Sequence, residues 1–200
     1  WLLGVWGLWG LLFSAYSIYL HSTYRSTMLD MALHSQLLWN LARGRFMVSS
    51  LLDHSFAANH FWPGLYLLVP IHELFGVHGL LVLQAFVVGA GLFPVYFLTL
   101  EMTDRINWAA ALGGCYLLHP TVSVGVLFDF HPEFFAMSGI LFALWAMHRR
   151  EYVWAGVFVL FSLAMYEVTA LVWCAAGGVL CMQKQQRRIG MTLCFFSAAY

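Results

Sequence analysis

One acidic hexapeptide stands out in a chain that carries few charges. It reads Phe128-Asp129-Phe130-His131-Pro132-Glu133 and lies between apolar runs. Asp129, His131 and Glu133 alternate, so an extended segment projects all three side chains to one face, whereas a helix projects only the two acids together. Either arrangement can bind a divalent cation such as magnesium, manganese or zinc, or hold a charged head group. The alternative is a solvated helix end, with Pro132 starting the next helix.

Two further places could contribute to the same chemistry. Glu167 lies in an apolar region where no nearby residue neutralises it, so either its partner comes from elsewhere in the fold or it lies in a turn exposed to water. His54 and His60, with Asp53, could join His131 at a metal, although their spacing fits no standard zinc pattern and histidines of a polar surface loop are the simpler interpretation.

The composition identifies the environment in which these groups must work. Hydrophobic residues make up 62% of the chain, aromatic residues 18% and charged residues 9%, whereas about a quarter of a soluble domain is charged. The chain is therefore expected to be an integral membrane protein. Its formal net charge of zero indicates no basic surface for nucleic acid. Ionisable groups at membrane depth cost roughly 2.5–3.5 kcal/mol each, so they tend to face a cavity, a partner or a substrate.

The apolar runs predict an all-α fold, a polytopic bundle of transmembrane helices within a single domain, residues 1–200. The expected spans are about 1–20, 79–100, 108–126, 134–147, 152–166 and 168–182, with the start of another at 190–200. His119-Pro120 predicts a break or kink inside the third span. Because the chain begins and ends within apolar runs, we expect a window on a longer protein.

Residues 21–60 form a long polar stretch that we expect to lie outside the hydrocarbon. Leucines at helical spacing predict an amphipathic helix on the membrane surface over residues 28–42, ended near Gly44. Asp30 lies at its start, where a carboxylate suits the helix dipole. Residues 61–75 are apolar but contain Pro63 and Pro70, which favours a re-entrant or interfacial helix.

The basic residues of the short connections predict the orientation. They fall on one side of an alternating topology, which the positive-inside rule makes cytoplasmic. These residues are Arg105, Arg149, Arg150, Lys184, Arg187 and Arg188. The long first loop, the hexapeptide and Glu167 are then external, so acids far apart in the sequence are expected to meet at one external mouth.

Four segments resemble a bacterial family of polytopic membrane proteins catalogued as domain of unknown function 2079. They are residues 30–46 (DMALHSQLLWNLARGRF), 60–63 (HFWP), 128–133 (FDFHPE) and 166–167 (YE), of which FDFHPE is the most specific. That family looks like the C-type glycosyltransferases, GT-C. The resemblance implies a location in the bacterial inner membrane, a catalytic Asp in the first external loop and a polyprenyl-phosphate-linked sugar as donor. Ser35 and Tyr166-Glu167-Val168 depart from the family, which often has an acid and a Lys-Glu-Asp run there.

Carried over by position, the resemblance gives the site residues their roles. Asp30 is expected to be the catalytic base that deprotonates an acceptor hydroxyl. The residues expected to bind the donor are Arg25, Gln36, His60, Asp129, His131, Glu133 and Glu167. The phosphate leaving group needs compensating charge, either from a divalent metal held by Asp129, His131 and Glu133 or from arginines of the first loop.

Two other classes of function remain open from the sequence. A transporter or channel would use the acids as a cation or proton path, but it predicts an inverted repeat, and the sequence has none that we recognise. A non-catalytic membrane subunit would bind lipid in the same external groove. In each case the membrane lipid is a partner, and the acceptor of a transferred sugar stays unnamed.

Overall fold

The computed structural model describes residues 1–183 and 186–200, and within them every regular element is helical. Lys184, used above to predict the orientation, lies outside the described residues. The helices are α1 (Leu2–Ser22), α2 (Leu29–Leu41), the short 3-10 helices η1 (Phe56–Ala58) and η2 (Pro63–Leu67), α3 (Val69–Gly89), α4 (Leu92–Thr103), α5 (Ile106–Leu118), α6 (Pro120–Phe128), α7 (Glu133–His148), α8 (Tyr152–Met165), α9 (Thr169–Met182) and α10 (Arg187–Ala199). The predicted all-α class is confirmed.

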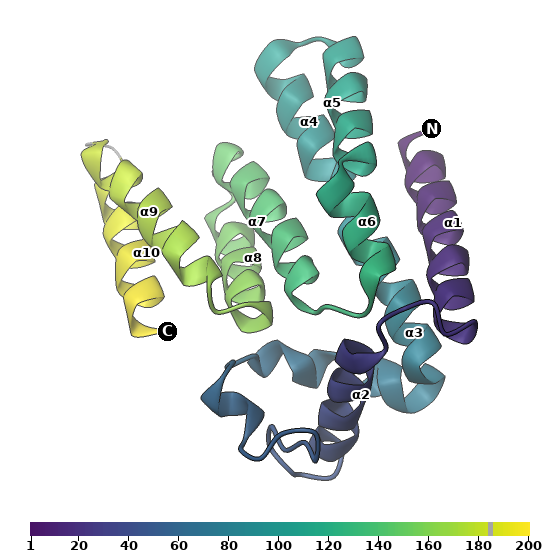
Figure 1. Cartoon of the computed structure of the whole chain (residues 1–200). Helices are drawn as coiled ribbons and strands as arrows, with labels where there is room; N and C mark the ends of the chain where they lie inside the picture. Colours follow the sequence, from purple (N-terminus) through teal and green to yellow (C-terminus); the bar gives the residue numbers. More distant parts are fainter. Residues whose placement is uncertain (184–185) are drawn as a thin grey trace.

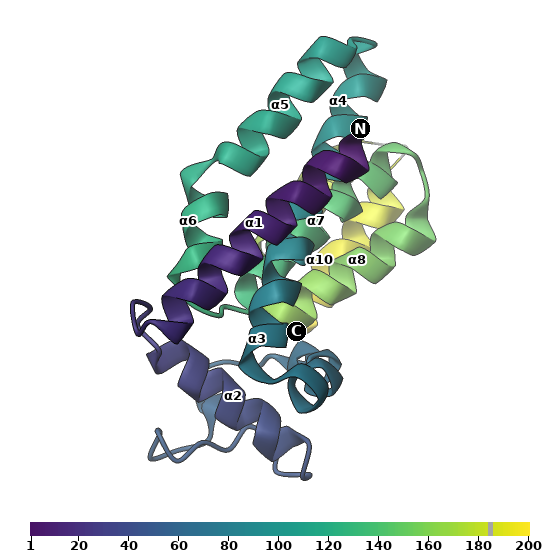
Figure 2. The same ribbon diagram turned by 90° about the vertical axis from the view of Figure 1, so that its right-hand side faces the viewer.

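The helices stand side by side in a bundle, and α2 with the loop after it covers one end (Figure 1). At that end α1 stops, α3 starts, α6 passes into α7 and α8 passes into α9, as the view turned by 90° also shows for α1, α2 and α3 (Figure 2). Among the described residues, three segments are long and apolar enough to cross a membrane: Leu2–Ser22, Val69–Thr103 and Ile106–Phe128. The helices α7, α8 and α9 are apolar but shorter, so the crossings expected there stay predictions.

The structure divides residues 61–103 differently from the sequence expectation. The boundary predicted between residues 75 and 79 corresponds to a kink inside α3 (Val69–Gly89), but a second break, between α3 and α4, divides the span predicted over 79–100. Pro70 lies in the first helical turn, where its missing N–H is not needed. Gly76 then has a φ of 61°, a left-handed conformation open to glycine, and kinks α3 at this point.

The third predicted span breaks where the proline suggested. Helix α5 ends at Leu118 and α6 begins at Pro120, with His119 between them in an extended conformation. The imidazole Nδ1 of His119 accepts a hydrogen bond from the Thr121 N–H, so the side chain caps α6. The two helices together still make one apolar segment long enough to cross a membrane.

Apolar side chains form two separate buried clusters. The larger one joins α1, α2, α3, α6 and the start of α7, and includes Trp9, Leu37, Leu81, Phe130 and Phe135. The smaller one joins α7, α8, α9 and α10 through Ala143, Val159, Leu163, Trp173 and Leu193. The hexapeptide lies in the larger cluster, since Phe130 is fully buried there.

Candidate functional site

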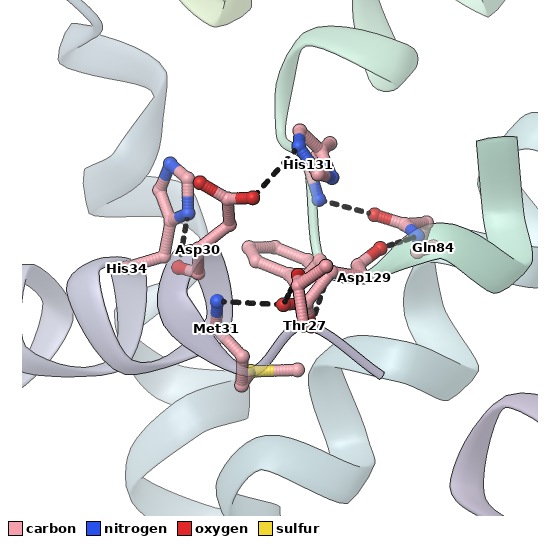
Figure 3. A network of polar contacts seen from close by, with 8 residues as sticks. Thr27, Asp30, Met31, His34, Gln84, Asp129 and His131 are labelled. Atoms are coloured by element: carbon pink, nitrogen blue, oxygen red, sulfur yellow. Dashed lines mark hydrogen bonds and ion pairs between the residues drawn. The ribbon is translucent and has the colours of Figure 1, made fainter. Parts of the chain in front are cut away.

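Asp129 lies against the beginning of α2 and caps it (Figure 3). Its Oδ2 accepts hydrogen bonds from the Thr27 hydroxyl at 3.0 Å and from the Met31 N–H at 3.3 Å. Met28, at the N-cap position of α2, makes no side-chain cap. A carboxylate that comes from 98 residues away along the chain therefore fills the place of a local cap and suits the positive end of the helix dipole. This contact fixes the first turn of α2, which carries Asp30.

Gln84 holds the other side of the hexapeptide. Its side chain is fully buried within α3. The amide Nε2 donates to the carbonyl oxygen of Asp129 at 2.8 Å, and Oε1 accepts from the His131 N–H at 2.7 Å. Backbone groups between two helices have no helical partners of their own and must be paired when they are buried. One amide side chain thus holds the turn between α6 and α7 in its non-helical path (Figure 3).

These two anchors bring Asp30 and His131 together. The Nε2 atom of His131 lies 3.5 Å from Oδ2 of Asp30. The side chain of Asp30 is 35% exposed and that of His131 is 16% exposed, so the pair is reachable from outside the protein. A carboxylate beside an imidazole can accept and orient protons. This contact adds to those of Asp129 with Thr27 and Met31, and it joins the first loop to the hexapeptide.

His34 lies one helical turn after Asp30 and is almost completely buried, at 4% exposure. Its Nδ1 lies 2.7 Å from the Asp30 carbonyl oxygen, which only accepts, so Nδ1 carries the proton. Burial lowers the pKa of His34 to about 4. The imidazole is therefore neutral near pH 7, and its Nε2 offers a lone pair.

Glu167 finds its partners in the first loop. Its carboxylate lies between α8 and α9, 2.7 Å from Nδ1 of His60, and it also accepts a hydrogen bond from the indole N–H of Trp62. The rings of Trp62 and His34 are stacked, with centroids 5.7 Å apart and planes at 7°. Trp62 therefore connects the Glu167 contacts to the Asp30 side of the site.

We refer to the whole set as the acid–histidine cluster: Asp30, His34, His60, Asp129, His131, Glu133 and Glu167.

Two residues expected in the site have other contacts. The amide of Gln36 joins α2 to the following loop, accepting from the Ser50 N–H at 2.8 Å and donating to the Ser50 hydroxyl at 2.7 Å. The guanidinium of Arg25 lies over the ring of Tyr19, 5.8 Å from its centroid. Glu133 begins α7, and its Oε2 is buried without a hydrogen-bond partner among the described residues.

The expected divalent metal does not fit the side chains as they are placed. Across residues 1–183 and 186–200, no group of three His, Cys, Asp or Glu side chains is arranged to hold a metal ion. The Asp129 carboxylate faces the first turn of α2, whereas His131 faces Asp30. A metal at the hexapeptide stays a prediction that this geometry does not support.

The sequence analysis did not select three residues that organise the site. Gln84 gave a signal, because it is a lone amide within a long apolar run. His34 also gave one, because its spacing from Asp30 places both on one face of a helix. Trp62 lies in the family segment 60–63, but its partner could not be predicted, since interfacial tryptophans are common in membrane proteins and the contact with Glu167 joins residues 105 positions apart.

Fold and site together define an all-helical membrane protein with a polar cluster at one end of its bundle. The family described as predicted membrane protein (DUF2079) matches residues 20–200, and the chain belongs to this family. No curated protein and no solved structure matches the chain.

Proposed function

We propose that the protein is a membrane glycosyltransferase of the C type, which transfers a sugar from a polyprenyl-phosphate donor to an acceptor on the external face of the bacterial inner membrane. One observation carries the proposal. Asp30, at the start of the first-loop helix α2, lies 3.5 Å from His131 of the hexapeptide. The resemblance implies that Asp30 is the catalytic base. The contact joins residues 30–46 to residues 128–133, two of the segments on which the resemblance depends.

In this proposal Asp30 takes the proton from the acceptor hydroxyl. The neighbouring His131 donates its Nε2–H to the Asp30 carboxylate and orients it, while Asp129 holds the turn of α2 that presents it. A side chain that acts as a general base contributes about 10²–10⁴-fold to a rate. The partial exposure of Asp30 supports this part, because an acceptor must reach the base from the aqueous side.

An apolar groove supports a lipid-linked donor. It lies between α7 and α9, has a volume of about 330 Å³ and is lined by Ile140, Leu141 and Val172, with Glu133 and Tyr166 among its other walls. A lipid-linked sugar has its chain in the bilayer and its polar head at the interface. The groove offers apolar walls for such a chain, and Glu133 belongs both to the groove and to the acid–histidine cluster.

The test is donor turnover in proteoliposomes. Polyprenyl-phosphate carrying a radiolabelled monosaccharide is supplied in the bilayer, and loss of label from the lipid phase is measured over a panel of sugars with an extract of cell-envelope acceptors. Asp30→Asn is expected to lower turnover by about 10²–10⁴-fold. Asp53→Asn is the matched control, because Asp53 is an exposed acid of the same loop that pairs only with His54. If Asp30→Asn turned the donor over at the wild-type rate, Asp30 would not be the catalytic base.

The same vesicles separate the other classes of function. The acids gather at one end of the bundle, where α2 covers the junctions of the other helices (Figure 1). A transport path needs polar groups along the bundle, so this placement favours a site at the membrane surface. Cation-dependent currents without label release would instead support a channel, and donor binding without turnover would support a lipid-binding subunit.

A further inference from the structure

Three buried polar atoms of the acid–histidine cluster have no hydrogen-bond partner among the described residues. They are Nε2 of His34, Nδ1 of His131 and Oε2 of Glu133. Buried polar atoms in folded proteins are nearly always paired, and those that are not call for a specific explanation. All three belong to the same cluster, which makes a shared explanation possible.

All three atoms are acceptors. In His34 the proton is on Nδ1, because Nδ1 faces a carbonyl oxygen, and Nε2 therefore has a free lone pair. In His131 the Nε2 faces the Asp30 carboxylate, which leaves the lone pair on Nδ1. The carboxylate form of Glu133 accepts only, although burial raises the pKa of this side chain. The cluster therefore offers hydrogen-bond acceptors in three places and needs donors from outside the chain.

The charges of the cluster disfavour an anionic ligand. It contains four carboxylates: Asp30, Asp129, Glu133 and Glu167. The arginine ion pairs of the described residues lie elsewhere: Arg43 with Glu73, and Arg149 with Glu101 and Glu151. The buried His34 adds no positive charge near pH 7, because its pKa is lowered to about 4. A phosphate would thus meet like charge and acceptor atoms, which is unfavourable on both counts.

The ring of His34 is held ready for such a contact. Its Nδ1 bond to the Asp30 carbonyl fixes one edge, and the indole of Trp62 covers one face. The ring of His60 also contacts Trp62, with ring centroids 4.7 Å apart. An acceptor whose position is fixed before binding loses little entropy when a ligand arrives. No group of three of these side chains is arranged around a single ion in the described parts of the chain, so the spacing suits a larger ligand with several donors.

We propose that the acid–histidine cluster binds the uncharged, hydroxyl-rich head of an amphiphile, with His34 Nε2, His131 Nδ1 and Glu133 Oε2 as acceptors for its hydroxyl groups. The phosphate of a phosphate-linked lipid then lies outside the cluster. This inference rests on the proposed function and deepens it, because it names the part of the donor that the cluster holds and assigns His34 as a binding residue.

The test compares two probes with the same chain and different heads, octyl β-D-glucoside and octyl phosphate. The protein is placed in phosphatidylcholine nanodiscs with ¹⁵N-labelled histidine, and each probe is titrated below its micelle concentration. At pH 7 the His34 signals are expected to show a neutral ring protonated on Nδ1. Octyl glucoside is expected to shift the Nε2 signal of His34, and octyl phosphate to leave it in place.

A variant isolates the contact. His34→Phe keeps an aromatic ring against Trp62 but removes the acceptor, and it is expected to weaken octyl glucoside binding about tenfold. His54→Phe is the matched control, because His54 is an exposed histidine of the same loop, and its binding is expected to equal that of the wild type. Circular dichroism and gel filtration of both variants check that the fold is retained.

The outcomes separate this inference from the function on which it rests. If the wild-type protein binds octyl glucoside but transfers no sugar, the proposed transferase activity is wrong, and the cluster is supported as a polyol-binding site. A shift of His34 by octyl phosphate, equal glucoside binding by His34→Phe, or binding of neither probe would each overturn the inference, even if transfer depends on Asp30.

Discussion

The acid–histidine cluster and the α9–α10 hairpin are held together in opposite ways. In the cluster, polar side chains bridge long stretches of sequence: 102 residues between Thr27 and Asp129, and 107 between His60 and Glu167. In the hairpin, the two helices come close together because glycines, which have no side chain, lie where they meet. A Cβ at Gly190 would come within 2.6 Å of both the Gly177 carbonyl oxygen and the Cys181 nitrogen.

The difference indicates which part of the molecule is the candidate for a binding site. Small residues allow helix backbones to approach closely inside a membrane, and they do so wherever two neighbouring helices meet. Buried polar groups are costly unless they are paired, so a chain that gathers seven ionisable side chains at one end carries a cost that packing alone does not explain. The cluster end is therefore the candidate site and the hairpin is part of the scaffold.

Gln84→Leu is expected to have the largest effect on stability. It leaves the Asp129 carbonyl and the His131 N–H buried without partners, at about 1–3 kcal/mol for each group, so about 2–6 kcal/mol of unfolding free energy is lost. Unfolding in mixed micelles with increasing dodecyl sulfate measures the loss. Ser138→Ala is the control. Ser138 is buried like Gln84, but it donates to backbone carbonyls within α3, and its loss is expected to cost about 1 kcal/mol or less. Equal effects would contradict the part given to Gln84.

Asp129→Ala is expected to cost about 1.5–3 kcal/mol, because the Met31 N–H and the Thr27 hydroxyl lose a charged acceptor. The effect is expected to concentrate in the first turn of α2, where hydrogen exchange at the Met31 amide accelerates. Asp129→Asn keeps an acceptor oxygen without the charge, so its loss is expected to be smaller. An equally protected Met31 amide in the alanine variant would show that α2 is capped in another way.

These two residues also show how far the sequence could be interpreted. The helix predicted over residues 28–42 depends on local leucine spacing, and α2 agrees within a residue at each end. The hexapeptide was recognisable from its composition, but the structural role of Asp129 as the cap of α2 was not. To predict that Asp129 caps α2, one must know that α2 starts without a side-chain cap of its own and that α6 ends beside it. The same holds for Gln84, whose partners lie 45 and 47 residues away.

The sequence predicted one of the two helix breaks within residues 61–103 and missed the other. Two prolines and the polar pair His72-Glu73 suggested an interfacial helix that ends at residue 75, next to the kink at Gly76, but nothing indicated the break between α3 and α4. Pro70 happens to fall in a first turn, and Gly76 allows α3 to bend and continue. The position of a proline relative to the start of a helix decides its effect, and that start was not visible in the local pattern.

Gly190→Ala tests the other side of the comparison and is expected to cost about 1–3 kcal/mol by overpacking the hairpin. The new methyl group would press on backbone atoms of α9, which cannot turn aside as a flexible side chain would. Gly178→Ala is the control, because no atom lies within 4 Å of its Cβ position, and it is expected to be neutral or slightly stabilising. Octyl glucoside binding at the cluster is expected to survive in both variants. Loss of that binding in Gly190→Ala would show that the two regions are coupled.

The smallest effect is expected at His54 and Asp53, an ion pair of the first loop outside the cluster. Their contact raises the pKa of His54 above its ordinary 6.5 and lowers that of Asp53 below its ordinary 3.8. The contribution of His54 to stability is thus fully present below pH 6.5 and is lost as the pH rises through its folded value. That of Asp53 is present above pH 3.8 and is lost as the pH falls through its folded value.

Both side chains are in water, where an ion pair contributes little to stability. Asp53→Asn is therefore expected to lower the pKa of His54 toward its ordinary value, as measured by NMR titration, without a measurable change in unfolding free energy. The contrast with Asp129→Ala is the decisive one: each variant removes a carboxylate that has polar partners, but only that of Asp129 is buried. If Asp53→Asn lost as much unfolding free energy as Asp129→Ala, burial would not determine the strength of these contacts. The contacts of the cluster would then not differ from those of the surrounding loop.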